Sequence, residues 1–131
     1  MIVKNCTLIR ALSCKKDTNI VEVAKTLREN RQRRIIVTND NQEPVGIIST
    51  TDINNKVVAE SKDTKELKAA DIMTSPIYLV ADIEDNLNNI FQKMMEHNSF
   101  FVPVIKEKKL YGILTYGELY ERVKNLVKNE H

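Results

Sequence analysis

Positions 49–52 carry the side chains best able to hold a ligand, three hydroxyls and the carboxylate of Asp52. They follow an apolar run, 45–48, that contains Gly46. If that run is a strand and a helix starts near Asp52, these groups surround a helix N-terminus, whose free N–H groups favour an anion. A carboxylate there can bind a ribose diol, and hydroxyls with N–H groups can hold a phosphate. The combination suits a nucleoside or nucleotide.

A structural role explains the same residues. Thr51 or Asp52 would then only cap the helix, by accepting hydrogen bonds from its first N–H groups. The segment alone favours capping, and only its context in the whole chain favours a ligand.

Other residue types offer little for catalysis. Cys6 and Cys14 form no C-x-x-C pair, and with His97 and His131 as the only histidines there is no zinc spacing. The three glycines exclude a phosphate loop and a dinucleotide fingerprint by their number and spacing. No paired acid and base or activated nucleophile appears, so we expect a protein that is not an enzyme and requires no cofactor.

Size and charge narrow the class further. The chain has 131 residues, 42% hydrophobic and 29% charged, as in a globular protein of one domain or two small ones. A net charge of +2 is too balanced to indicate a nucleic-acid binder. No apolar run approaches the ~20 residues of a membrane helix, and the start lacks the pattern of a signal peptide. We therefore expect a cytoplasmic protein without a membrane or nucleic-acid partner.

The chain repeats itself. At an offset of 67 residues the apolar positions of 20–27 coincide with those of 87–94, and 34–37 coincides with 101–104. After the loss of one residue in a turn, 45–49 coincides with 111–115, glycine included. The repeats are expected to span residues 1–61 and 62–131.

Each repeat has the pattern of a β-α-β-β-α unit. Apolar residues at i, i+3, i+4 and i+7 predict helices, and short β-rich runs flank turn residues. The expected elements are extended pieces at 8–12 and 77–80, helices at 20–30 and 87–97, strands at 34–38, 45–48, 102–105 and 110–114, and closing helices at 53–60 and 118–128. Thr18 and Asp85 are expected to cap the first helices, and 66–73 to add a helical turn. This alternation predicts an α/β fold (α+β by some schemes) of two repeats packed with pseudo-twofold symmetry.

The repeats resemble a tandem pair of cystathionine-β-synthase (CBS) domains, a Bateman module. The residues that carry the likeness are the apolar-Pro-Val strand at 102–104, the Gly-apolar-apolar-Ser-x-x-Asp motif at 46–52 and the phrase at 71–76. Two positions depart from the family pattern, Ile36 in place of Pro and Glu118 in place of Asp. The second departure is expected to displace a ribose contact.

The resemblance implies a regulatory module that binds an adenosine-containing ligand, such as AMP, ADP, ATP or S-adenosylmethionine, between the repeats. By analogy, the first site would use Ser49, Thr50, Thr51 and Asp52 with Ile90, Phe100, Phe101, Val102 and Pro103. The second would use Thr115 and Glu118 with Thr18, Val23, Arg33, Arg34 and Ile35. Because neighbours on a strand face opposite ways, at most one of the two phenylalanines should line a purine slot. The basic run 28–34 fits either a phosphate or a solvated helix end.

Similar modules also imply a homodimer and a regulated protein partner. The alternative is an assembly module without a ligand, which would act through its helix faces alone. Those faces would comprise Phe91, Met94, Met95, Val57, Val58, Leu119, Val123, Leu126 and Val127.

Overall fold

A computed structural model describes the backbone of residues 1–129 and the side chains of residues 1–124. The chain divides into two compact units, which we call the N unit (residues 12–77) and the C unit (residues 1–11 and 78–131). The units differ from the sequence repeats, because residues 1–11 belong to the unit of the second repeat and residues 62–77 to the unit of the first.

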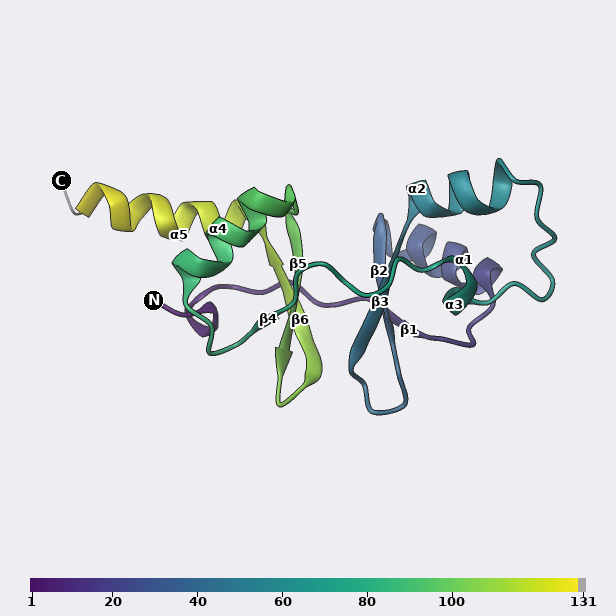
Figure 1. The fold of residues 1–131 in the computed structure, drawn as a ribbon, viewed down its shortest axis with the longest axis horizontal. Helices are drawn as coiled ribbons and strands as arrows, with labels where there is room; N and C mark the ends of the chain where they lie inside the picture. Colours follow the sequence, from purple (N-terminus) through teal and green to yellow (C-terminus); the bar gives the residue numbers. More distant parts are fainter. Residues whose placement is uncertain (130–131) are drawn as a thin grey trace. The chain divides into compact units, whose positions relative to one another are not determined.

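The N unit is a three-stranded sheet with helices on one face (Figure 1). Strand β2 lies in the middle, parallel to β1 and antiparallel to β3. Its elements are β1 (Ser13–Lys15), α1 (Ile20–Asn30), β2 (Arg34–Thr38), β3 (Pro44–Ser49), α2 (Thr50–Ile53), a π-helical turn (Asn54–Val58) and α3 (Ala69–Ile72).

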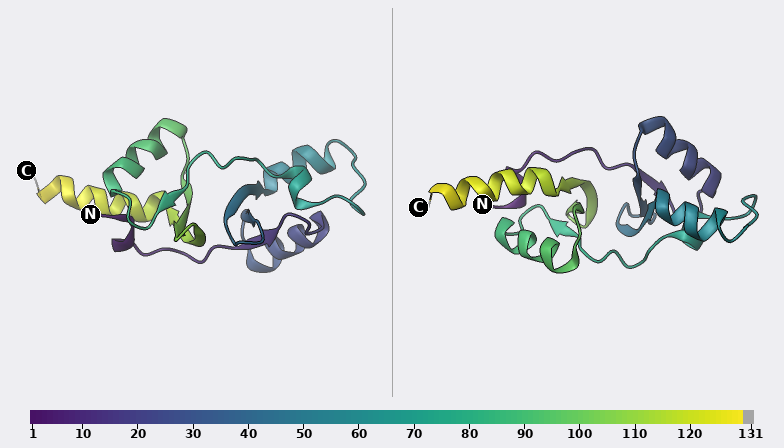
Figure 2. Two further views of the ribbon diagram at one scale, coloured as in Figure 1. Left: turned by 60° about the horizontal axis from the view of Figure 1, so that its bottom comes forward. Right: turned by 90° about the horizontal axis from the view of Figure 1, so that it is seen from above.

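The C unit repeats this plan, again with its helices on one face of its sheet (Figure 2). Strand β5 is parallel to β4 and antiparallel to β6. Its elements are a 3-10 turn (Val3–Asn5), β4 (Ala81–Asp82), α4 (Leu87–His97), β5 (Phe101–Lys106), β6 (Lys109–Thr115) and α5 (Tyr116–Asn129). The predicted α/β order of both repeats is confirmed.

Helices α1 and α4 have the predicted bounds, but the predicted caps are wrong. The carbonyl oxygen of the Asn19 side chain accepts from Val21 N–H at 2.8 Å, and that of Asn86 accepts from Asn89 N–H at 3.2 Å. These residues immediately precede the helices. Thr18 and Asp85, one residue earlier, accept bonds from the turns that lead into the helices instead.

The first strand of each unit also lies later than expected. The segments 8–12 and 77–80 were expected to be extended strands, but β1 and β4 follow them. The chain passes from one unit to the other after Ala11 and after Ile77, within these segments. The closing helix of the first repeat begins at Thr50, three residues before the expected start.

Each unit has its own apolar core between its sheet and its helices. The N-unit cluster joins α1 to β2 and α3 through Val23, Ile35 and Ile72. The C-unit cluster joins α4 and α5 to the sheet through Ile90, Val102 and Leu119. These side chains are almost fully buried, which is the main source of stability for such short elements.

The two sequence repeats exchange the segments that lead into them, which we call the leading segments (residues 2–9 and 68–74). Thr74 exchanges two backbone hydrogen bonds with Ile47 of β3, at 3.1 and 2.9 Å. Ile9 does the same with Ile113 of β6, at 3.0 Å each way. Each sheet is therefore bordered by a segment from the other repeat.

Glycine stands where each leading segment crosses a strand. A Cβ on Gly46 would lie 2.5 Å from Met73 Sδ, and a Cβ on Gly112 would lie 3.1 Å from Leu8 Cβ and 3.2 Å from the Ile9 carbonyl oxygen. The glycine that both repeats share thus leaves room for the Met73 side chain in the N unit, and for Leu8 and the Ile9 carbonyl in the C unit.

We predict that Gly112→Ala lowers the free energy of unfolding by about 1–3 kcal/mol, as overpacking does. The added methyl group would press on Leu8 and on the Ile9 carbonyl, which belongs to rigid backbone. Chemical denaturation of both proteins measures the difference. Gly117→Ala is the matched control, because a Cβ there meets nothing within 4 Å and alanine favours a helix. Equal stability of Gly112→Ala and the parent would contradict the close approach.

Candidate ligand-binding site

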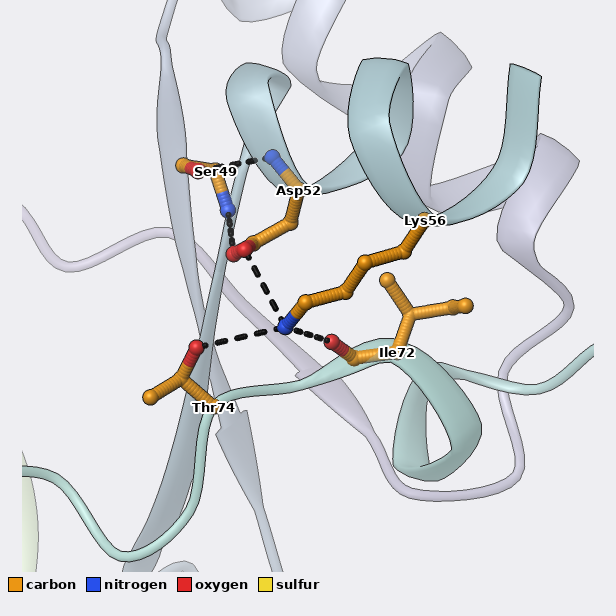
Figure 3. Close-up of polar contacts among 5 residues, drawn as sticks. All are labelled: Ser49, Asp52, Lys56, Ile72 and Thr74. Carbon is orange, nitrogen blue, oxygen red and sulfur yellow. Dashed lines mark hydrogen bonds and ion pairs between the residues drawn. The ribbon is translucent and has the colours of Figure 1, made fainter. Parts of the chain in front are cut away.

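Ser49 and Asp52 form a reciprocal pair of hydrogen bonds at the start of α2 (Figure 3). Asp52 N–H donates to Ser49 Oγ over 3.0 Å, and Ser49 N–H donates to Asp52 Oδ2 over 2.9 Å. This capping box satisfies two backbone donors that the helix leaves free. The capping role is therefore real: Ser49 is the N-cap residue, in place of Thr51 or Asp52, and the Asp52 side chain completes the capping box.

Lys56 lies one turn further along and fixes the other side of the carboxylate (Figure 3). Its Nζ is 3.2 Å from Asp52 Oδ1, and it donates to the Ile72 carbonyl over 3.0 Å and to Thr74 Oγ1 over 3.5 Å. These contacts match the three donors of an ammonium group. Lys56 therefore joins the motif to the leading segment of the second repeat.

The Asp52 carboxylate keeps capacity for a further partner. A carboxylate offers about four acceptor positions, and the two contacts above use one on each oxygen. The side chain is 18% exposed, so solvent still reaches it. The neighbouring hydroxyl residues Thr50 and Thr51 are exposed. Residues 50–52 thus present hydroxyl groups and carboxylate oxygens beside the ammonium group of Lys56.

The second motif, at the start of α5, is built differently. Glu118 N–H donates to Thr115 Oγ1 over 3.4 Å. The longer Glu118 side chain carries its Oε1 to Thr7 N–H at 3.2 Å and to Arg122 Nε at 2.9 Å. The carboxylate is therefore bound to a leading segment and to its own helix, and the displaced ribose contact remains a prediction.

Hydrogen bonding lowers the pKa of Glu118, and burial raises the pKa of both cysteines. The hydrogen bond from Arg122, supported by that from Thr7, holds the pKa of Glu118 below its ordinary value of 4.5 against the opposing effect of burial. Burial, with the nearby Glu118 charge, raises the pKa of Cys6. Burial alone raises the pKa of Cys14 to about 11. Both thiols are thus protonated at neutral pH, which argues against a nucleophilic cysteine.

The apolar residues proposed for the purine slots are core residues of their own units. Val23 and Ile35 belong to the N-unit cluster, and Ile90 and Val102 belong to the C-unit cluster. None of the four is more than 1% exposed. Pro103 is buried on β5. Residues so enclosed can offer a ligand only their backbone groups or one edge of their side chains.

The remaining predicted residues lie nearer the surface. Phe100 is exposed and Phe101, the first residue of β5, is partly buried. Arg33 and Arg34 are exposed, and the Arg33 carbonyl accepts from Thr50 N–H over 2.9 Å. The hydroxyl of Thr18 accepts from Lys15 N–H in a turn. The combination of residues from both repeats into shared sites remains a prediction.

Three contact residues, Lys56, Arg122 and Thr7, escaped the sequence analysis. The contacts of Lys56 and Arg122 could have been predicted from the sequence. Asp52 and Lys56, like Glu118 and Arg122, are opposite charges four residues apart on a helix. The contact of Thr7 with Glu118 could not, because it spans 111 residues of sequence.

Neither a metal centre nor a membrane span emerges from the part of the chain that the structure describes. Its His, Cys, Asp and Glu side chains nowhere gather in threes that could hold an ion. Its helices are too short or too polar to cross a bilayer.

Comparison with known proteins agrees with this architecture. The CBS domain family matches residues 6–59 and 69–125. A CBS domain protein from Pyrobaculum aerophilum, solved in complex with AMP, superposes with a TM-score of 0.78 at 26% identity, covering 100% of both chains. A CBS domain pair solved with 5′-methylthioadenosine and S-adenosyl-L-methionine has a TM-score of 0.71 at 25% identity, covering 100% of this chain and 98% of that one.

An uncharacterized protein of Methanopyrus kandleri is 30% identical over 102 residues, 77% of this chain and 52% of that protein. The chain spans about half the length of the first curated relatives that it matches.

We predict that part of the stability of the C unit disappears in acid. Because the pKa of Glu118 is lowered on folding, its contribution is complete well above 4.5 and is lost as pH falls through the lowered value. Glu118→Gln should therefore be less stable than the parent at neutral pH, with a gap that closes on acidification. Denaturation at a series of pH values measures the gap, with Glu96→Gln as control, because Glu96 is an exposed residue of α4. A gap independent of pH would contradict the assignment.

Proposed function

Because the chain belongs to the CBS domain family, we propose that it is a regulatory module that binds an adenosine-containing ligand. The observation that carries the proposal is the likeness, over the whole chain, to CBS proteins solved with AMP or with 5′-methylthioadenosine and S-adenosyl-L-methionine. The proposal includes no catalytic step and no required cofactor. AMP, ADP, ATP and S-adenosylmethionine are the candidate ligands.

The first motif is the proposed binding element. Asp52 would accept hydrogen bonds from the ribose diol with the acceptor positions that Ser49 and Lys56 leave open. The hydroxyls of positions 49–51 would lie near a phosphate. Lys56 already spends its donors on Asp52 and the leading segment, so it would act as a positioning residue. The apolar residues named from the family likeness would contribute shape.

The second motif is the weaker candidate. Arg122 and Thr7 both donate to Oε1 of Glu118, so this carboxylate is turned toward its own helix and a leading segment. A ribose could use the acceptor positions that remain only in that orientation. We therefore expect one principal site, at Asp52.

The module would act through other molecules. We propose that the chain forms a homodimer and that a protein partner reads the state of the ligand. The cytoplasmic location that the sequence suggests remains a prediction.

We predict that Asp52→Ala weakens the binding of AMP by roughly ten- to a hundredfold, because it removes charged hydrogen bonds worth about 1.5–3 kcal/mol. It should also lower stability by about 1 kcal/mol through the lost cap. Isothermal titration calorimetry of the folded protein separates affinity from stability.

Asp71→Ala is the matched control for this experiment. Asp71 accepts from Lys68 N–H over 2.9 Å at the start of α3, with the geometry that Asp52 has on Ser49. It should lose stability and keep its affinity, and Glu118→Ala should have the smaller effect on affinity. Equal affinity of parent and Asp52→Ala would leave Asp52 a capping residue only. A loss confined to Glu118→Ala would transfer the site to the second repeat.

A further inference from the structure

The C unit has a cleft of about 360 Å³ between residues 4–10, the turn after β4 and the β5–β6 hairpin. We call it the basic cleft. The apolar side chains of Leu8 and Ile83 line it together with three exposed cations, Lys4, Arg10 and Lys106. Sites for small molecules have volumes of about 300–1,000 Å³, so a small ligand fits this space.

Backbone hydrogen bonds within the C unit hold the walls of the basic cleft in place. Lys4 N–H donates to the Ile83 carbonyl over 2.9 Å, and Ile83 N–H donates to the Ile105 carbonyl over 3.0 Å. Ile9 and Ile113 exchange two hydrogen bonds of 3.0 Å. The cleft is therefore formed before any ligand binds, which lowers the cost of ordering backbone on binding.

The cations of the basic cleft have no counter-charge. No carboxylate lines the cleft, and within the described side chains Lys4, Arg10 and Lys106 form no ion pair. Lys106 Nζ instead lies 5.5 Å from the centroid of the Tyr111 ring, a cation–π contact with a residue that is 55% exposed. A cleft lined by charges of one sign concentrates ions of the opposite sign.

The fold does not require these cations, because the N unit has the same plan without them. At offsets of 67 and 66 residues, Asn39 and Val45 stand where the C unit has Lys106 and Tyr111. The part of the chain that borders the N-unit sheet, residues 69–77, contains no Lys or Arg. The positive charge is therefore a property of the C unit and not of the repeat.

A smaller cleft of about 290 Å³ lies at the corresponding turns of the N unit. Two lysines, Lys15 and Lys16, line it together with two carboxylates, Asp17 and Asp40. Lys15 Nζ also donates to the Asn39 carbonyl over 3.2 Å. Its charges are thus balanced within the protein, in contrast to those of the basic cleft.

The basic cleft lies apart from both ligand-binding motifs. Asp52 belongs to the N unit. In the C unit, Tyr111 precedes Thr115 by four residues of β6, which span about 13 Å along a strand. The hairpin and the start of α5 are at opposite ends of this strand (Figure 1). A ligand in the basic cleft would therefore not occupy the adenosine site.

None of the residues that line the basic cleft belongs to the helix surface that the sequence assigned to an assembly module. The structure also revises that surface. Four of its residues, Val57, Met94, Leu119 and Val123, are core residues of their own units. The side chains of Leu126 and Val127 lie outside the described residues. Of the others, Val58 and Met95 are exposed and Phe91 is partly buried.

We propose that the basic cleft binds a small phosphate-bearing anion at a site of its own. A guanidinium group binds phosphate oxygens in pairs, and an ammonium group binds them as a point charge. One Arg and two Lys side chains therefore suit a group with several negative charges, such as a diphosphate. Leu8, Ile83 and the Tyr111 ring could contact an organic part. Free phosphate and an organic phosphate share this chemistry, and the test separates them.

The test is a titration of the full chain with sodium pyrophosphate at constant ionic strength, followed by two-dimensional 1H–15N NMR. The backbone amides of Lys4, Ile83 and Lys106 should shift and saturate. The triple variant Lys4→Gln, Arg10→Gln, Lys106→Gln should raise the dissociation constant by roughly tenfold or more, because it removes charged hydrogen bonds. Circular dichroism verifies folding, and Arg10→Gln with Lys106→Gln replaces the triple variant if that does not fold.

Lys15→Gln with Lys16→Gln is the matched control. It removes two lysines from the corresponding cleft of the N unit and should bind pyrophosphate as the parent does. Phenyl phosphate and inorganic phosphate distinguish the two sources of the anion. Tighter binding of phenyl phosphate would identify an organic phosphate, and equal binding would identify free phosphate.

Several results would overturn the inference. Shifts that never saturate, or equal affinity of the parent and the triple variant, would leave the basic cleft a solvated surface. Shifts confined to residues 49–52 would assign the phosphate to the adenosine site. Binding of a polyglutamate peptide without binding of pyrophosphate would assign the cleft to an acidic protein segment.

The proposed function is tested separately on the same variants. The triple variant should keep the affinity of the parent for AMP, and Asp52→Ala should keep its affinity for pyrophosphate. Loss of AMP binding in the triple variant would show that the two sites are one, which contradicts a site of its own. A parent that binds pyrophosphate in the cleft but no adenosine compound would refute the proposed function and leave this inference standing.

Discussion

The exchange of leading segments is the constraint on which the rest of the structure depends. Neither leading segment borders the sheet of its own repeat, because Thr74 pairs with Ile47 and Ile9 pairs with Ile113. At each crossing the strand has a glycine, Gly46 or Gly112, where a Cβ would press on the leading segment. The two halves of the chain therefore complete one another's units, although each unit has a core of its own.

The same exchange reaches both motifs. In the N unit, Lys56 connects the Asp52 carboxylate to Ile72 and Thr74 of a leading segment. In the C unit, Glu118 accepts directly from Thr7 of the other. A ligand that engages Asp52 would therefore act on a group already coupled to the crossing between repeats. Through Lys56, a ligand bound at Asp52 could thus affect the backbone of the leading segment at Ile72 and Thr74.

The regular elements followed from the sequence, and the long-range contacts did not. Helices α1 and α4 were predicted to the residue, because their apolar stripes report burial directly. The caps were assigned one residue too early, since Thr18 and Asp85 are equally good capping types. The exchange of leading segments could not be predicted from the sequence. An apolar pattern shows that a segment is buried, but it does not show which sheet buries it. The substitution at Glu118 was informative, because one methylene group redirects a carboxylate.

The candidate site divides in the same way. The sequence placed hydroxyls and a carboxylate at a helix start, and it left capping and ligand binding as alternatives. The structure has the capping box and leaves acceptor positions on Asp52. The two roles are compatible, because a carboxylate has more acceptor positions than the cap uses.

The most direct test of the account is a thermal shift assay of the parent protein against AMP, ADP, ATP and S-adenosylmethionine, with GMP as control. A ligand bound to the folded state at a hundredfold excess over its dissociation constant stabilises by about 2.7 kcal/mol. The account predicts a rise in melting temperature with at least one adenosine compound and none with GMP. No shift with any adenosine compound would contradict it.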